Sequence, residues 1–106
     1  MQRDCFVLRL KPGRVSDYLA AHGGIRADVL DAIRGKGWSN FSLFVLAEEG
    51  LVIGYRERAE GRAPGSGAES PPSEVGELWQ ESMAEYFVNG RPDWHMRRPE
   101  EYFHLE

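Results

Sequence analysis

Two ionisable ring side chains, Tyr18 and His22, stand four residues apart in the segment SDYLAAHGG. If this segment is helical, the spacing puts both rings on one face, about 40° apart around the helix axis. A phenol and an imidazole together offer a donor, an acceptor and a group that titrates near neutral pH, which proton transfer on a polar substrate requires. The spacing also fits a structural pair, with Tyr18 packed half-buried and His22 ending the helix before Gly23 and Gly24.

A second candidate pair, Trp79 and Gln80, is adjacent in the chain. An indole ring can support the apolar face of a sugar while a neighbouring amide binds its hydroxyl groups. The alternative is structural, because Trp79 also shares a helical spacing with Val75, Leu78 and Met83. In that case Trp79 belongs to the core and Gln80 is exposed to solvent.

Other kinds of site find little support in this sequence. The single cysteine and three widely spaced histidines form no metal-binding pattern, so no metal site is predicted. A net charge of -4 argues against a nucleic-acid or anionic membrane surface as partner. No apolar run approaches the ~20 residues that span a bilayer, and the charged start MQRDCF does not fit a signal peptide, so we expect a cytoplasmic protein.

The elements that must position these residues follow from hydrophobic periodicity and turn residues. We expect strands over 4–11, 38–47, 51–59 and 100–106, and helices over 16–23, 26–35 and from Ser73 to about residue 89. Ser16 and Ser73 are the expected N-caps. This βαββαβ order is typical of a ferredoxin-like α+β fold, in which an antiparallel sheet carries its helices on one face.

Residues 61–73, GRAPGSGAESPPS, contain nine Gly, Pro or Ser in thirteen positions. This composition predicts a flexible loop within a single domain that spans residues 1–106. The other face of the expected sheet has no helix to cover it. A homodimer packed sheet against sheet would bury that face.

The chain resembles the L-rhamnose mutarotases, small dimeric enzymes with a ferredoxin-like fold. The matching segments are CFVLRLKPGRVSDYLAAH at 5–22, DVLDAIRGKGWSNFSLFV at 28–45, GLVIGY at 50–55, SEVGELWQESMAEYF at 73–87 and the terminal EEYFHLE. They cover most of the chain in the order of the family. The resemblance implies a dimeric α/β barrel and a cofactor-independent isomerase that interconverts the α and β anomers of a free deoxy sugar.

The resemblance also assigns roles to individual residues. It implies sugar binding for Tyr18 and proton donation for His22, so both are candidate catalytic residues. Trp79 and Gln80 match the sugar-contacting pair of the family. Phe41 stands where relatives often have a tyrosine that touches the substrate.

Three positions depart from the family pattern. Arg26 replaces a tryptophan, Phe41 lacks the tyrosine hydroxyl, and Leu78 replaces an arginine before the tryptophan of the last helix. These changes favour an altered substrate. The alternative function is therefore a dimer of the same family that binds or cyclises another small metabolite in secondary metabolism, using Arg26, Phe41 and Trp79. A non-catalytic sugar-binding relative is the third interpretation.

Overall fold

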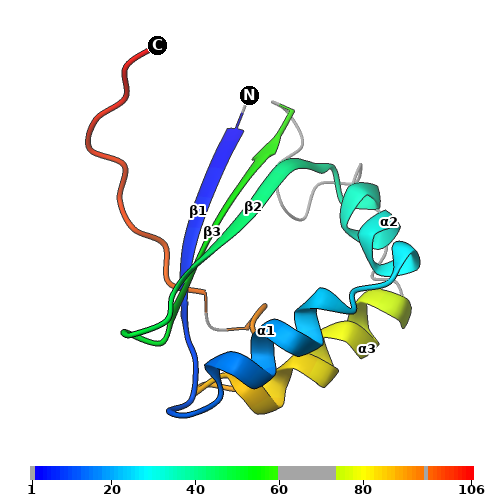
Figure 1. The fold of residues 1–106 in the computed structure, drawn as a ribbon. Coiled ribbons are helices and arrows are strands. Elements are labelled where there is room, and N and C mark those ends of the chain that lie inside the picture. Colours follow the sequence, from blue (N-terminus) through cyan, green and yellow to red (C-terminus); the bar gives the residue numbers. More distant parts are fainter. Residues whose placement is uncertain (1, 60–73, 95) are drawn as a thin grey trace.

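The computed structural model describes residues 2–59, 74–94 and 96–106 (Figure 1). Its elements in chain order are β1 (Gln2–Arg9), α1 (Val15–Gly23), α2 (Ala27–Gly35), β2 (Trp38–Leu46), β3 (Leu51–Arg58), α3 (Glu74–Met83) and a short 3-10 helix η1 (Ala84–Tyr86). The predicted loop 61–73 lies outside the described residues. Within them, every helix is too short or too polar to cross a membrane.

The three strands form one antiparallel sheet in the order β1-β3-β2. The helices gather on one face of this sheet, as Figure 1 shows. A tight turn joins β2 to β3, and Gly50 in that turn has a φ of 66°, which favours glycine. The predicted α+β class, the hairpin and the first three strands are confirmed.

The N-terminal end of α1 corrects one detail of the prediction. The helix begins at Val15 after Arg14, and Ser16 lies inside it rather than at its cap. The predicted end at Gly23 is confirmed, and the end at Gly35 of the following helix is confirmed as well. The C-terminal ends of both helices lie beside the space between the helices and the sheet. Gly23 and Gly35 therefore set how far each helix extends along this space.

The predicted fourth strand, 100–106, is wrong for this chain on its own. The terminal segment is extended but belongs to no strand, and it runs away from the sheet in Figure 1. Val7 and Arg97 still form an antiparallel bridge, with N to O distances of 2.7 and 3.1 Å. Pro99, two residues after Arg97, has no N–H to donate to Cys5, the next residue in this register, so the ladder stops there.

The inner face of the sheet has an apolar end. Phe6 and Leu8 of β1, and Leu10 just after the strand, are buried at alternate positions beside Val52 of β3, as the period of two in strands requires. They meet buried side chains from the helical layer, namely Tyr18, Met83 and Phe87. Gly54 is essential here, because a Cβ at that position would lie 2.1 Å from Phe6 Cζ.

Strand β2 contains an irregularity between Ser39 and Ser42, where one extra residue opposes β3. Asn40 lies in this bulge with a φ of 46°. Trp38 is paired with Arg58 before the bulge, and Leu43 is paired with Gly54 after it. Because paired residues share a face, Trp38 and Leu43 both point to the inner side although their numbers differ in parity.

Candidate active site

A cavity of about 890 Å³ lies between the inner face of the sheet and the helices. This volume falls in the range of small-molecule sites, which is roughly 300–1,000 Å³. All three strands and all three α-helices contribute to its wall. All five candidate site residues of the sequence analysis line it, namely Tyr18, His22, Phe41, Trp79 and Gln80.

Helix α1 presents Tyr18 and His22 on one face, as the four-residue spacing predicts. Their ring centroids are 5.7 Å apart. Tyr18 is buried, and its ring packs edge-on against Phe87 at 5.2 Å. His22 is half-buried and lies 5.6 Å from Trp79, at an interplanar angle of 74°. The structure therefore brings together three rings that come from two separate helices.

Burial sets the protonation of the first two rings. Desolvation raises the pKa of Tyr18 to about 12, so its phenol keeps its proton at neutral pH. Desolvation also lowers the pKa of His22 below its ordinary value near 6.5, although a backbone hydrogen bond partly opposes this. At pH 7 the His22 ring is therefore neutral, with one nitrogen that donates a hydrogen bond and one that accepts.

Helix α3 supplies Trp79 and Gln80. Trp79 packs against the core cluster and also lines the cavity. The core interpretation and the sugar-binding interpretation of this residue each describe part of its position. The expected solvent exposure of Gln80 is wrong, because the side chain is half-buried in the cavity wall. Its Oε1 atom is buried without a hydrogen-bond partner among the described residues. Such an acceptor is available to a hydroxyl group of a ligand.

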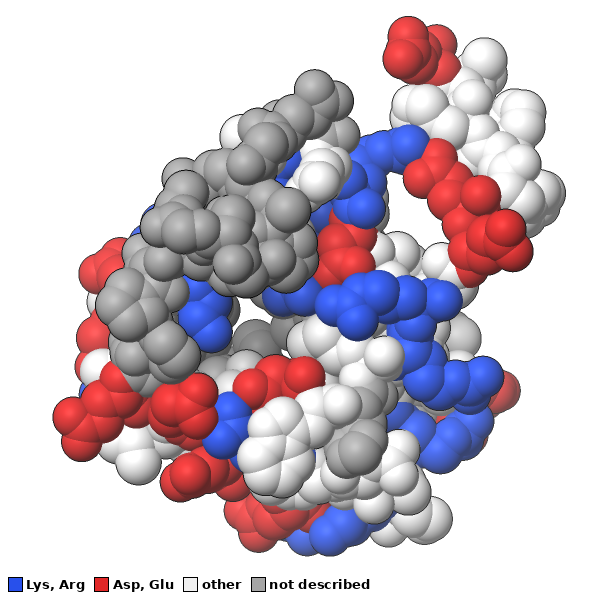
Figure 2. All heavy atoms as spheres, turned by 180° about the vertical axis from the view of Figure 1, so that it is seen from behind, with Lys and Arg blue, Asp and Glu red and all other residues white. Residues whose placement is uncertain are grey.

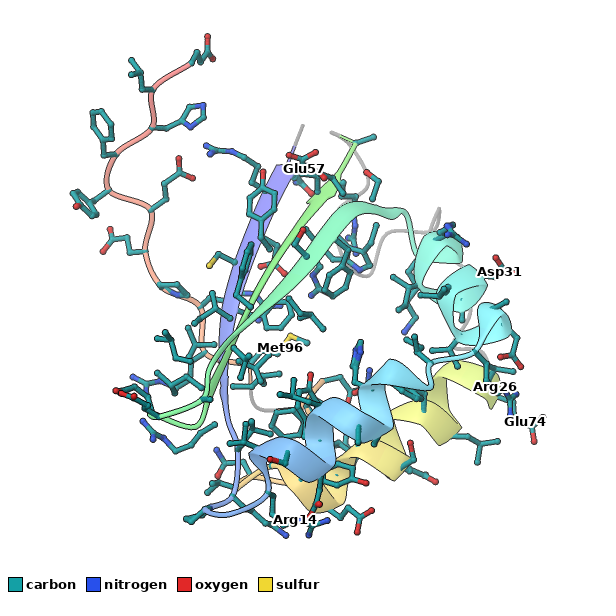
Figure 3. All side chains as sticks on the ribbon, in the orientation of Figure 1. Arg14, Arg26, Asp31, Glu57, Glu74 and Met96 are labelled. Atoms are coloured by element: carbon teal, nitrogen blue, oxygen red, sulfur yellow. The ribbon has the colours of Figure 1, made fainter. Side chains whose placement is uncertain are left out.

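The three positions that depart from the family pattern differ in location. Phe41 lines the cavity and packs edge-on against Phe6 at 6.1 Å. Arg26 is exposed, forms an ion pair with Asp28, and lies on the outer side of the helices in Figure 3. Leu78 is 59% exposed. Neither Arg26 nor Leu78 lines the cavity, which removes Arg26 from the site that the alternative function requires.

The sequence analysis missed a charged part of the cavity wall. Arg56 on β3 and Trp38 on β2 both line the cavity, and the Arg56 guanidinium lies 3.8 Å from the centroid of the Trp38 ring. A signal was present in the strand LVIGYRER, because period-two alternation places Arg56 on the same face as Val52. The composition of this strand indicated its secondary structure but not which residues would face a ligand.

Metal ligands do not gather in the part of the chain that the structure describes. No group of three or more His, Cys, Asp or Glu side chains there is placed to hold a metal ion. The polar side chains that line the cavity include the His22 imidazole, the Tyr18 phenol, the Gln80 amide and the Arg56 guanidinium.

Comparison with known proteins identifies the family. A sequence model described as L-rhamnose mutarotase matches residues 3–105, almost the whole chain. The chain belongs to the L-rhamnose mutarotase family. An L-rhamnose mutarotase from Sinorhizobium fredii is 29% identical over 85 residues, which cover 80% of this chain and 79% of the relative. One from Sinorhizobium medicae is 28% identical over the same shares.

A solved structure supports the fold independently. The crystal structure of an L-rhamnose mutarotase from Formosa agariphila superimposes with a TM-score of 0.78 and covers 100% of both chains, at 20% identity. This likeness shows the fold. The expected membership of the L-rhamnose mutarotase family, and with it the class of cofactor-independent isomerases, is confirmed by the family match.

Proposed function

We propose that this protein interconverts the α and β anomers of a free deoxy sugar of the L-rhamnose type. The observation that carries the proposal is the contact of Tyr18, His22 and Trp79 in the wall of one sugar-sized cavity. These are the residues to which the family resemblance assigns proton transfer and sugar binding. Tyr18 and His22 come from α1 and Trp79 comes from α3. The other contacts of these two helices hold the rings in place.

The reaction needs one proton donor and one proton acceptor. A proton leaves the anomeric hydroxyl while another reaches the ring oxygen, and the bond between C1 and the ring oxygen breaks. The open-chain aldehyde then rotates and closes on its other face. We propose that His22 is the catalytic residue that exchanges a proton with the sugar, and that the Tyr18 hydroxyl hydrogen-bonds to a sugar oxygen. Each proton-transfer group contributes roughly 10²–10⁴-fold to such a reaction.

The other predicted site residues would hold the sugar. The Trp79 indole offers an apolar surface for the sugar ring, and the unpaired Gln80 Oε1 can accept a hydrogen bond from a hydroxyl group. Phe41 adds a second aromatic wall from the sheet. Because Phe41 has no hydroxyl, its contribution is confined to packing.

The test is anomer exchange of L-rhamnose and L-fucose, followed by saturation transfer between the anomeric protons in NMR spectra. We expect His22→Ala to lower the catalysed rate by about 10²-fold or more. His104→Ala is the matched control, since His104 is outside the cavity lining and should leave the rate unchanged. Trp79→Ala should instead raise KM. If His22→Ala exchanges anomers as fast as the parent protein, the proposed mechanism is wrong.

We also propose a homodimer in which the terminal segment 100–106 of each copy packs on its partner. Tyr102, Phe103 and Leu105 are 96%, 71% and 81% exposed, which is unfavourable for an isolated chain. In the register set by Val7 and Arg97, Tyr102 would lie opposite Gln2, so the residues after it extend beyond the start of β1. A strand that pairs with residues 103–106 must therefore come from elsewhere.

Sedimentation or light scattering tests the dimer. We expect twice the chain mass of 12.0 kDa at micromolar concentration. A chain that stops after Pro99 should sediment as a monomer. A monomeric parent protein would contradict the proposal, and so would a truncated chain that remains dimeric.

A further inference from the structure

Arg56 lines the cavity but has no role in the proton transfer proposed above. Its side chain is only 12% exposed. The guanidinium carbon lies 3.8 Å from the centroid of the Trp38 ring, 5.0 Å from that of Phe6 and 5.6 Å from that of Phe41. All three rings also line the cavity. Cation–π contacts with them therefore hold the guanidinium in the cavity wall.

The positive charge of Arg56 is already opposed by a carboxylate. Arg56 Nε donates to Asp4 Oδ2 at 2.7 Å, and the Asp4 side chain is half-buried. Arg98, which is exposed, donates from Nε to the other oxygen of this carboxylate at 2.9 Å. Figure 2 shows acidic and basic side chains next to one another around a hollow in the face opposite to the view of Figure 1. A ligand beside Arg56 therefore need not be an anion.

The Arg56 guanidinium keeps N–H groups for such a ligand. A guanidinium carries five N–H donors. Nε is used by Asp4, and Nη2 points to Met96 Sδ, a weak acceptor, at 3.8 Å. Nη1 makes no hydrogen bond with any of the described residues. A half-buried donor of this kind gains free energy when an oxygen atom of a ligand accepts its hydrogen bond.

The Phe41 ring connects Arg56 to the proposed sugar site. Phe41 is the wall of that site on the sheet side, and its ring centroid lies 5.6 Å from the guanidinium carbon. A sugar carbon that touches this ring lies about 4 Å from the ring atoms, and an N–H group reaches an oxygen about 3 Å from its nitrogen. A sugar packed on Phe41 can therefore place a hydroxyl oxygen within reach of Arg56.

We infer that Arg56 is a specificity-determining residue, which donates a hydrogen bond to one hydroxyl oxygen of a neutral deoxy sugar packed on Phe41. The inference rests on the proposed function, which makes Phe41 a wall of the sugar site. Because a hydroxyl group both accepts and donates, the same group can accept from Arg56 and donate to another acceptor. A sugar without this hydroxyl would leave the guanidinium donor unpaired. Asp4 is a positioning residue, because its carboxylate holds Arg56 Nε.

Variants of Arg56 are the first test. Saturation transfer at increasing L-rhamnose concentrations separates kcat from KM. Arg56→Met keeps an apolar stem but removes the donors, so we expect KM to rise about tenfold while kcat stays nearly unchanged, as for a hydrogen bond made equally to bound sugar and transition state. Arg56→Lys keeps a positive charge beside Asp4 and should raise KM less. Arg26→Met is the matched control, because Arg26 lies outside the cavity lining and should change neither constant.

Sugars that lack single hydroxyl groups are the second test. The parent protein and Arg56→Met are each given L-rhamnose and its 2-deoxy, 3-deoxy and 4-deoxy analogues. We expect one analogue to raise KM of the parent protein about tenfold, and Arg56→Met to cause no further rise with that analogue. The other analogues should show the full effect of Arg56→Met, because they retain the hydroxyl that Arg56 binds.

The outcomes distinguish this inference from the proposed function. If exchange depends on His22 but Arg56→Met leaves KM unchanged, changes kcat alone, or raises KM by the same factor for every analogue, the inference is overturned and the proposed function stands. If Arg56→Met does not fold, Arg56→Lys takes its place in both tests. If no deoxy sugar exchanges in the parent protein, the proposed function fails and calorimetric titration with the same sugars decides the inference. Affinity lost through Arg56→Met for all sugars except one analogue supports it, and equal affinities or no binding overturn it.

Discussion

The two ends of the inner face of the sheet carry different kinds of side chain. At one end Leu8, Leu10 and Val52 are buried against the helical layer, where Leu8 and Val52 also border the cavity. At the other end Arg56 and Trp38 face the cavity. Val52 and Arg56 follow the same alternation along β3, so secondary structure alone does not distinguish core from site. The difference lies in the side chains and in how closely the helices approach.

Leu10→Ala should have the largest effect on stability, and this effect should be confined to the apolar end of the inner face. Leu10 is 3% exposed and does not line the cavity, so its truncation should lower the free energy of unfolding by about 2–5 kcal/mol. Urea unfolding measures this loss, and KM for the sugar should stay the same. Leu46→Ala, at a 51% exposed position, is the control and should cost far less. Equal losses for the two variants would show that the apolar end is not the stability core.

Gly54→Ala tests the boundary between the two ends. The new Cβ would lie 2.1 Å from Phe6 Cζ, so the ring must move. Overpacking of this kind costs about 1–3 kcal/mol. Because the Arg56 guanidinium lies 5.0 Å from the Phe6 ring, sugar binding should weaken too. Gly23→Ala, which meets no atom within 4 Å, should be nearly neutral. A stable Gly54→Ala variant would mean that Phe6 does not fix the position of the site.

Gln80→Leu should stabilise the protein while impairing the site. It removes a buried oxygen that has no hydrogen-bond partner among the described residues, and leaving such an atom unpaired costs about 1–3 kcal/mol. We expect a higher melting temperature together with a higher KM. Gln80→Ala, which removes the oxygen but leaves a gap, serves as the comparison and should not stabilise. A loss of stability in Gln80→Leu would show that the amide is needed by the fold.

The smallest effect should be on stability at mildly acidic pH. The folded protein lowers the pKa of His22 by desolvation, whereas the unfolded chain has the ordinary value near 6.5. The unfolded state therefore takes up the proton first, and stability falls as the pH drops below about 6.5 towards the folded pKa. Urea unfolding at pH 7.5 and 5.5 should show a smaller difference for His22→Gln than for the parent protein. Equal pH dependence would place His22 in a solvated environment.

The local pattern of the sequence predicted much of this arrangement. The four-residue spacing of Tyr18 and His22 was enough to place both rings on one helix face, because helical geometry fixes neighbours three and four residues apart. Their meeting with Trp79, at 5.6 Å from His22, depends on how α1 packs against α3. That packing cannot be predicted from local sequence patterns. It entered the sequence analysis only through the family resemblance.

Two errors have physical causes. The terminal segment has the composition of a strand, but Pro99 cannot donate to β1 and the residues after Tyr102 extend beyond the start of β1, so no ladder forms. The role of Arg56 was missed because a charged residue in a strand is ordinarily assigned to the solvent side. Here the burial of Arg56 depends on Asp4, which is 52 residues away in the sequence.

The bulge at Asn40 also determines which residues of β2 face the cavity in this chain. One additional residue reverses which side of β2 each later residue occupies, so Trp38 and Leu43 both face inward. Deleting one codon there would turn half of the strand over, exchanging Leu43 and Val45 with Phe44 and Leu46. A single small deletion would thus rebuild the ligand-facing surface of this sheet without substituting any of the residues that follow it in the strand.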